Sequence, residues 1–165
     1  MRAWLFATAC LAPILASTAA RAEESKIALG DVPKASLQAV KALFPGADIV
    51  GAAKETEECK TFFEVTLKQK GRNIDVTINS GGTIQLVESE IAENELPKTV
   101  RQALDAKYPK ATYKMVEAVD RVKDGKRTLD FFEALLVTAD KRSLEVQVAP
   151  DGKIKNEETK SGDGD

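Results

Sequence analysis

Histidine is absent from this 165-residue chain, and cysteine occurs only twice. Without histidine, the chain lacks the commonest general base and cannot form a Ser-His-Asp or Cys-His site. A zinc site is also disfavoured, because zinc prefers histidine and cysteine ligands. No Gly-rich phosphate motif leads from an expected strand into a helix. We therefore expect a protein that is not an enzyme, with no catalytic residues, no cofactor and no metal site.

A long apolar run is also missing, and the main apolar segment stands at the N-terminus. It extends from Trp4 to Ala16, which is too short for a membrane-spanning helix of about 20 apolar residues. Arg2 precedes it, and Ala20-Arg21-Ala22 follows it as a small-x-small cleavage pattern. We predict that residues 1–22 are a signal peptide cleaved near Ala22. The mature chain is then periplasmic or secreted, with no membrane span.

The two cysteines support different predictions. Cys10 could carry the lipid of a lipoprotein, but Ala7-Thr8-Ala9 lacks the large apolar residue of such signals, so simple cleavage is favoured. Cleavage leaves Cys59 alone, and a lone cysteine cannot form an intramolecular disulfide. The carboxylates of Glu57-Glu58 beside it favour the less reactive protonated thiol. The fold is therefore expected to depend on its apolar core, and no role is assigned to Cys59.

Positive charge is not in excess. The chain has 24 Lys and Arg residues against 26 Asp and Glu residues, and cleavage near Ala22 removes Arg2 and Arg21. A net negative protein is poorly suited to bind nucleic acid or an anionic membrane surface. Neither is an expected partner.

Four carboxylates lie close together near the middle of the chain: Glu88, Glu90, Glu93 and Glu95. Two converging carboxylates can supply an acid/base pair, and several can supply a calcium site. The spacing here matches no calcium loop, and a charged linker explains these residues more simply. The short polar tail, residues 161–165, is predicted to be disordered.

Segments of the chain recur in the same order. The offset between matching segments grows only from 64 to 70 residues, which predicts two tandem repeats, at 30–90 and 91–160. The matching pairs are Val32-Pro33 and Leu96-Pro97, Phe44-Pro45 and Tyr108-Pro109, Phe62-Phe63-Glu64 and Phe131-Phe132-Glu133, and Gly82 and Gly152.

Each repeat is predicted to be one helix followed by a four-stranded antiparallel meander. Apolar residues recur at helical spacing ahead of Pro45 and of Pro109, with Asp31 as the N-cap of the first helix. After each helix the apolar period becomes two, as in Phe63–Leu67 and Leu144–Val148. We therefore expect an α+β fold of two units. In each unit the helix covers the apolar face of its own sheet, and the other face is open to water.

The second strand of each repeat differs on its outward face. In the first repeat this face is mostly polar, whereas in the second it is mostly apolar. Packing between the repeats, or a central place in a sheet, explains such a strand. A partner site is the alternative, because an exposed apolar patch often marks an interface. The candidate partner-binding residues are Phe62, Phe131, Leu135 and Val137.

Each repeat resembles the PepSY-like family of exported bacterial proteins, part of which is beta-lactamase-inhibitor-like in fold. The residues that carry the resemblance are Pro33 and Pro97, Phe44-Pro45 and Tyr108-Pro109, Phe63 and Phe132, and Gly82 and Gly152. The resemblance covers about residues 30–160. It implies a non-enzymatic extracytoplasmic domain that binds or inhibits another protein, and it supplies no catalytic residues.

The sequence favours an exported module that binds a protein or peptide of the envelope and acts as an inhibitor or regulator of an extracytoplasmic enzyme. Two alternatives stay open. One is a carboxylate-dependent hydrolase acting on envelope polymers, and the other is a passive envelope component with no specific ligand.

Overall fold

The fold comes from a computed structural model that describes residues 23–57 and 60–160. The predicted signal peptide and polar tail, together with Cys10 and Cys59, lie outside the described residues. Within the described part, no helix is both long enough and apolar enough to cross a membrane.

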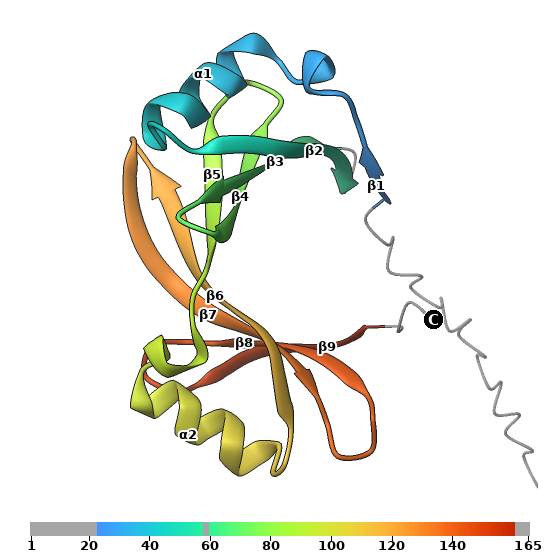
Figure 1. The fold of residues 1–165 in the computed structure, drawn as a ribbon, viewed down its shortest axis with the longest axis vertical. Coiled ribbons are helices and arrows are strands. Elements are labelled where there is room, and N and C mark those ends of the chain that lie inside the picture. Colours follow the sequence, from blue (N-terminus) through green and yellow to red (C-terminus); the bar gives the residue numbers. More distant parts are fainter. Residues whose placement is uncertain (1–22, 58–59, 161–165) are drawn as a thin grey trace, which may run out of the picture.

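Nine antiparallel strands form one continuous sheet, in which each strand pairs with its neighbours in the chain (Figure 1). The elements in chain order are β1 (Glu23–Lys26), η1 (Leu29–Asp31), α1 (Lys34–Leu43), β2 (Asp48–Glu57), β3 (Lys60–Gln69), β4 (Arg72–Asn79), β5 (Ile84–Glu90), η2 (Glu93–Glu95), α2 (Lys98–Lys107), β6 (Thr112–Lys123), β7 (Lys126–Val137), β8 (Ser143–Val148) and β9 (Ile154–Lys160). The spatial order of the strands is therefore their chain order, with α1 placed between β1 and β2 and α2 between β5 and β6.

The predicted fold of two units, each with its own four-stranded sheet, is wrong. β5 is hydrogen-bonded to β6, in register from Leu86 opposite Arg121 to Glu90 opposite Glu117. The strands assigned to two sheets are therefore one sheet, and β1 adds a further strand by pairing with β2. An unpaired strand edge leaves backbone N–H and C=O groups without partners, and the pairing of β5 with β6 satisfies them.

Both helices begin directly after a proline. Pro33 and Pro97 occupy the N-cap positions of α1 and α2, where the missing N–H of proline loses no hydrogen bond. The predicted Asp31 N-cap is wrong, because Asp31 belongs to η1. The C-cap of each helix, Phe44 or Tyr108, is followed by another proline, which disfavours helical backbone at the residue before it. Local sequence therefore sets both ends of both helices.

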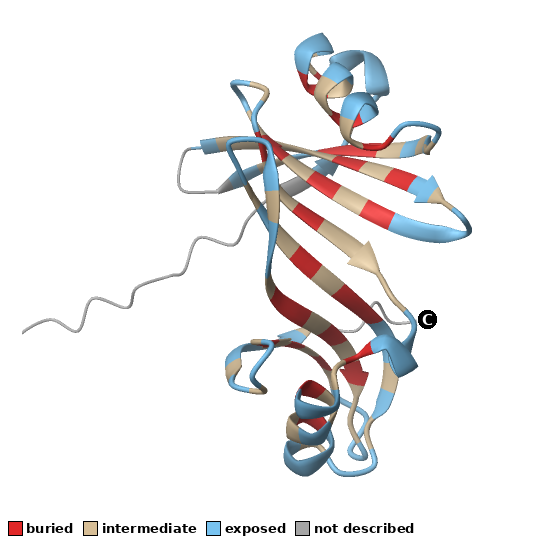
Figure 2. Ribbon diagram, turned by 90° about the vertical axis from the view of Figure 1, so that its left-hand side faces the viewer, coloured by how far each residue is buried: buried red, intermediate tan, exposed pale blue. Residues whose placement is uncertain are grey.

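Both helices pack on the same face of the sheet. Val40 of α1 and Val87 of β5 belong to one apolar cluster, and Val100 of α2 belongs to a second cluster, against which Ala118 of β6 packs. Ser89, two residues after Val87 and so on the same face, lies directly opposite Ala118. Figure 2 shows the result, in which buried residues alternate with less buried ones along the central strands. Two apolar clusters therefore lie on one side of the sheet, one beneath α1 and one beneath α2.

Ser36 of α1 is a polar residue inside this core. It is 0% exposed, and its hydroxyl has no hydrogen-bond partner among the described residues. The third residue of α2, Val100, is apolar at the matching helix position and is equally buried. We expect Ser36→Ala to raise the free energy of unfolding by about 1 kcal/mol, because it removes a buried hydroxyl without a partner. Urea unfolding measures this change.

Thr99→Val is the control for that substitution. The Thr99 hydroxyl donates a hydrogen bond to the Pro150 carbonyl oxygen at 3.0 Å, so its removal is expected to lower the stability instead. A loss of stability in Ser36→Ala would show that the Ser36 hydroxyl has a partner after all.

Candidate functional site

Neither helix covers the other face of the sheet, which we call the open face. The sheet is strongly twisted and curves into a C, with the helices outside and the open face lining the hollow (Figure 1). Because side chains alternate between the two faces of a strand, the open face carries the residues that alternate with the core. Any ligand that approaches the inside of the C meets these side chains.

Cross-strand pairing arranges the open face in rows. One row, from β5 to β8, is Glu90, Glu117, Glu133 and Gln147. The next row, from β3 to β7, is Thr66, Asp75, Glu88, Val119 and Phe131. Directly opposite residues of antiparallel strands have Cβ atoms about 5 Å apart. The middle of the open face is therefore a cluster of neighbouring carboxylates.

A groove of about 570 Å³ lies on the open face, and we call it the acidic groove. Its lining comes from strands at both ends of the sheet. Five of the lining residues are glutamates: Glu55, Glu64, Glu88, Glu133 and Glu145. The apolar part of the lining is Phe62 and Leu86, and the cations are Arg121 and Lys160.

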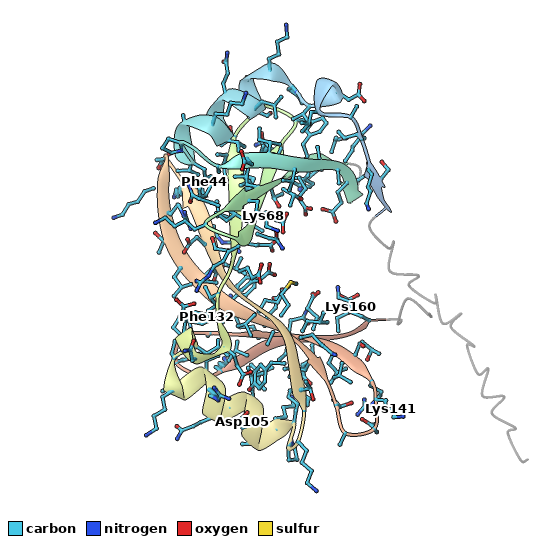
Figure 3. The ribbon with its side chains drawn as sticks, in the orientation of Figure 1. Phe44, Lys68, Asp105, Phe132, Lys141 and Lys160 are labelled. Atoms are coloured by element: carbon cyan, nitrogen blue, oxygen red, sulfur yellow. The ribbon has the colours of Figure 1, made fainter. Side chains whose placement is uncertain are left out.

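Both cations of the groove are held by other carboxylates. Lys160 Nζ lies 2.7 Å from Glu145 Oε2, and Figure 3 shows Lys160 at the edge of the hollow, near the end of β9. Arg121 donates to Asp130 at 2.7 Å. Neither cation forms an ion pair with Glu88, Glu117 or Glu133. Positive charge therefore stays at the rim, and the middle of the groove is negative.

Glu117 is the only charged residue that is buried among those described. Its exposed fraction is 5%, and it makes no hydrogen bond or ion pair with another described residue. Its neighbour Glu133 accepts a hydrogen bond from Gln147 Nε2 at 3.0 Å, and Glu90 accepts one from the backbone N–H of Asn73 at 3.0 Å. Glu117 is thus a carboxyl that lacks a partner of its own.

Burial and mutual repulsion keep protons on these carboxyls. Burial, followed by the nearby Glu133 and Glu117 carboxylates, raises the pKa of Glu88 to about 8. Burial, followed by Glu133, raises the pKa of Glu117 to about 7. Burial and Glu145 also raise the pKa of Glu133, although its hydrogen bond from Gln147 acts against this. The carboxyls of Glu88 and Glu117 therefore gain and lose protons near neutral pH.

The structure places the predicted partner-binding residues in different surroundings. Phe62 lines the acidic groove. Phe131 is only 7% exposed, and the Lys155 ammonium lies 4.8 Å from the centre of its ring. Leu135 lies opposite Glu145, and Val137 lies opposite Ser143 near the end of β7. Of the four, Phe62 is the one that the groove exposes to a ligand.

The carboxylates that were predicted to form a charged linker lie instead in a strand or in ion pairs. Glu88 and Glu90 belong to β5 and face the open side of the sheet. Glu93 pairs with Arg101, and Glu95 pairs with Arg72 at 2.8 Å. Sequence reasoning missed Glu117, although a single charge within Val116-Glu117-Ala118-Val119 was a usable signal. Within the described ranges, no group of three or more Asp, Glu, Cys or His residues could together hold a metal ion.

No protein-family model and no curated protein sequence matches this chain. Several solved structures are similar in fold. A DUF2874 family protein from Bacteroides uniformis has a TM-score of 0.62 at 18% identity, covering 77% of this chain and 88% of that one. A BLIP-like protein from Bacteroides fragilis has a TM-score of 0.58 at 17% identity, covering 81% and 91%. A candidate periplasmic protein from Bacteroides eggerthii has a TM-score of 0.62 at 14% identity, covering 77% and 88%.

These similarities establish the fold alone, because the sequence identities are low. They confirm the beta-lactamase-inhibitor-like fold that the sequence resemblance predicted. The narrower PepSY-like assignment stays a prediction.

Proposed function

We propose that this chain is an exported, non-enzymatic protein that binds a protein or peptide of the envelope through the acidic groove and the surrounding open face. The observation that carries the proposal is a sheet with its core on one side and a groove of about 570 Å³ on the other. Uncovered concave surfaces of this kind are where ligands bind in most proteins. The predicted signal peptide at 1–22 and the fold shared with BLIP-like and candidate periplasmic proteins support an extracytoplasmic location.

The carboxylates of the groove support binding better than hydrolysis. A hydrolase that uses two carboxylates needs one protonated group beside one that stays ionised. Burial raises the pKa of Glu88 and Glu133, which line the groove, and of Glu117, which lies on the strand between theirs. Neither cation of the groove pairs with any of the three to hold it ionised as a base, so a binding role is the better explanation.

Photo-crosslinking tests the proposed binding face. A photoreactive amino acid is placed at Phe62 in the groove and, as the matched control, at Leu29, which is 39% exposed in η1 and does not line the groove. We expect discrete crosslinked adducts in the envelope fraction from position 62 and none from position 29. Phe131 is unsuitable, because it is buried and a substitution there would disturb packing. Equal labelling from both positions, or none from position 62, would contradict the proposal.

A further inference from the structure

We propose that the acidic groove receives a basic segment of its partner, with a Lys or Arg side chain of that segment placed against Glu88 and Glu133 of the lining and against Glu117, which lies on the strand between theirs and on the same face. This inference rests on the proposed function, because it names the chemistry of the partner that the open face binds. It follows from four features of the groove: the position of the carboxylates, the missing counter-charge, the size of the space and the apolar residues beside it.

The three carboxylates lie on adjacent strands in the middle of the sheet. Glu117 of β6 lies directly opposite Glu133 of β7 and, on its other side, opposite Glu90 of β5. Glu88 precedes Glu90 by two residues and so projects from the same face. A single cation above Glu117 would therefore lie near carboxylates of three strands.

Among the described residues, no cation pairs with Glu88 or Glu117. Glu117 is 5% exposed and has no hydrogen bond or ion pair with a described residue, and Glu88 likewise has neither. A buried carboxylate without a partner is unfavourable, and folded proteins retain such groups mainly where a ligand completes the site. A cation bound beside Glu117 would supply the partner that the described residues do not.

The charged residues that face Glu88 and Glu117 come from the strands on both sides, and most of them are acidic. The acidic residues are Glu64 on β3, Asp75 on β4, Glu90 on β5, Glu133 on β7 and Glu145 on β8. The basic residues on this face include Lys68 on β3, Arg121 on β6, and Lys155 and Lys160 on β9, and Lys155 pairs with Asp130 at 2.8 Å. Arg121 and Lys160 are paired with Asp130 and Glu145. A partner that carries positive charge is therefore favoured over a neutral or acidic one.

A side-chain cation fits the groove better than a metal ion. No group of three carboxylates among the described residues converges on one point closely enough to hold a metal. The groove of about 570 Å³ also has apolar walls at Phe62 and Leu86, against which the methylene stem of Lys or Arg can pack while its head meets the carboxylates. A Lys or Arg side chain matches both the apolar walls and the carboxylates of the groove.

Binding of this kind is coupled to protons. Burial raises the pKa of Glu88 to about 8 and that of Glu117 to about 7, so both carboxyls carry protons for part of the time at neutral pH. A bound cation favours the ionised forms and expels these protons. Because Lys remains charged up to about pH 10, affinity for a lysine segment is expected to rise about tenfold between pH 6 and pH 8.

The test uses the mature protein and a fluorescently labelled hexalysine peptide. Fluorescence anisotropy measures affinity at pH 6, 7 and 8. Calorimetry in two buffers of different ionisation enthalpy counts the protons released on binding. We expect tighter binding at higher pH, release of up to about one proton at pH 7, and no binding of a hexaglutamate peptide. The proton count needs no variant, so it stays informative if a variant folds poorly.

Matched variants separate the site from general charge attraction. Glu117→Gln and Glu88→Gln are expected to weaken hexalysine binding at pH 8 at least fivefold and to reduce proton release. Glu93→Gln removes the same charge outside the groove, where Glu93 pairs with Arg101, and is expected to change binding less than twofold. Equal effects of the three variants, or binding without proton release, would overturn the inference. Tighter binding of Ca²⁺ or of spermine than of hexalysine would also overturn it, in favour of a small-ion or polyamine site.

The crosslinking experiment distinguishes this inference from the proposed function. If position 62 crosslinks to a partner segment that contains no Lys or Arg, the result supports the proposed binding face and contradicts the inference of a basic segment. If hexalysine binds with proton release but position 62 yields no adduct, the result supports cation binding by the carboxylates and contradicts the proposed protein-binding role.

Discussion

Gly152→Ala is expected to lower the free energy of unfolding by about 3 kcal/mol, a large effect for one added methyl group. Gly152 ends the turn between β8 and β9 and has a φ of +89°, where a residue with a Cβ is strained. A Cβ built there would lie 2.9 Å from the backbone carbonyl oxygen of Thr99 in α2. A backbone oxygen near the start of a helix cannot move aside cheaply, so the turn and α2 would have to separate. Urea or thermal unfolding measures the loss.

Gly82→Ala is the matched control. Gly82 ends the corresponding turn before β5, with a φ of +83°, but its added Cβ would meet only ordinary contacts of 3.6 Å, to Ala35 and Ser36 of α1. We expect a loss of about 1 kcal/mol, from backbone strain alone. Equal losses in the two variants would show that the contact between Gly152 and α2 is not tight.

The double variant Glu88→Gln, Glu117→Gln is expected to be more stable than the wild type at pH 9 by at least about 3 kcal/mol, and equally stable near pH 4.5. Burial and like charges raise the pKa values of Glu88 and Glu117 from 4.5 to about 8 and about 7. A carboxyl whose pKa is higher in the folded state favours folding fully below its unfolded pKa. That contribution is lost as pH rises through the folded pKa. The wild type should therefore lose stability between about pH 5 and pH 8, and the double variant should not.

Glu95→Gln is the control with the opposite sign. Glu95 accepts a hydrogen bond from the Ala92 backbone N–H at 2.6 Å and pairs with Arg72, and these contacts lower its pKa. Its removal should reduce stability at pH 9, with the difference vanishing as pH falls through that pKa. Chemical denaturation at fixed ionic strength across the pH range measures all three proteins. A double variant that gains nothing at pH 9 would show that the groove carboxyls titrate normally.

The stability that the double variant is expected to gain is relevant to the function of the groove. Two glutamates in the middle of a sheet lower the stability of the isolated protein at neutral and alkaline pH, whereas glutamine would not. Natural proteins retain such unfavourable groups mainly at functional sites. The stability measurement therefore supports the groove as a binding site by a route independent of any partner.

The positions of most elements were predictable because local patterns set them. The second helix ends just before Pro109, as predicted, and the strand predicted at Leu144–Val148 is observed at Ser143–Val148. The assembly of the strands was not predictable in the same way. Whether β5 is an edge or pairs with β6 depends on contacts between residues such as Glu88 and Val119, which are 31 positions apart in the chain. The prediction of two separate sheets failed at that step.

The candidate site, too, was only partly predictable from local sequence patterns. Apolar residues drew attention to the strand that contains Phe131, but that ring is covered by Lys155. The glutamates that line the groove stand in different strands, each in an ordinary alternating pattern. Only the register between strands brings Glu88, Glu117 and Glu133 together, and register is not visible in any one segment.

By itself the sequence determined the absence of histidine chemistry, the helix ends at proline, the turns at glycine and the alternation of the strands. These depend on the preferences of single residues and their near neighbours. The tertiary structure alone decided that the strands form one curved sheet, that Phe131 is buried, and that Glu88, Glu117 and Glu133 of three adjacent strands are neighbours on the open face. Burial and electrostatic repulsion depend on which distant segments meet, and so no local pattern could reveal that Glu117 lacks a partner.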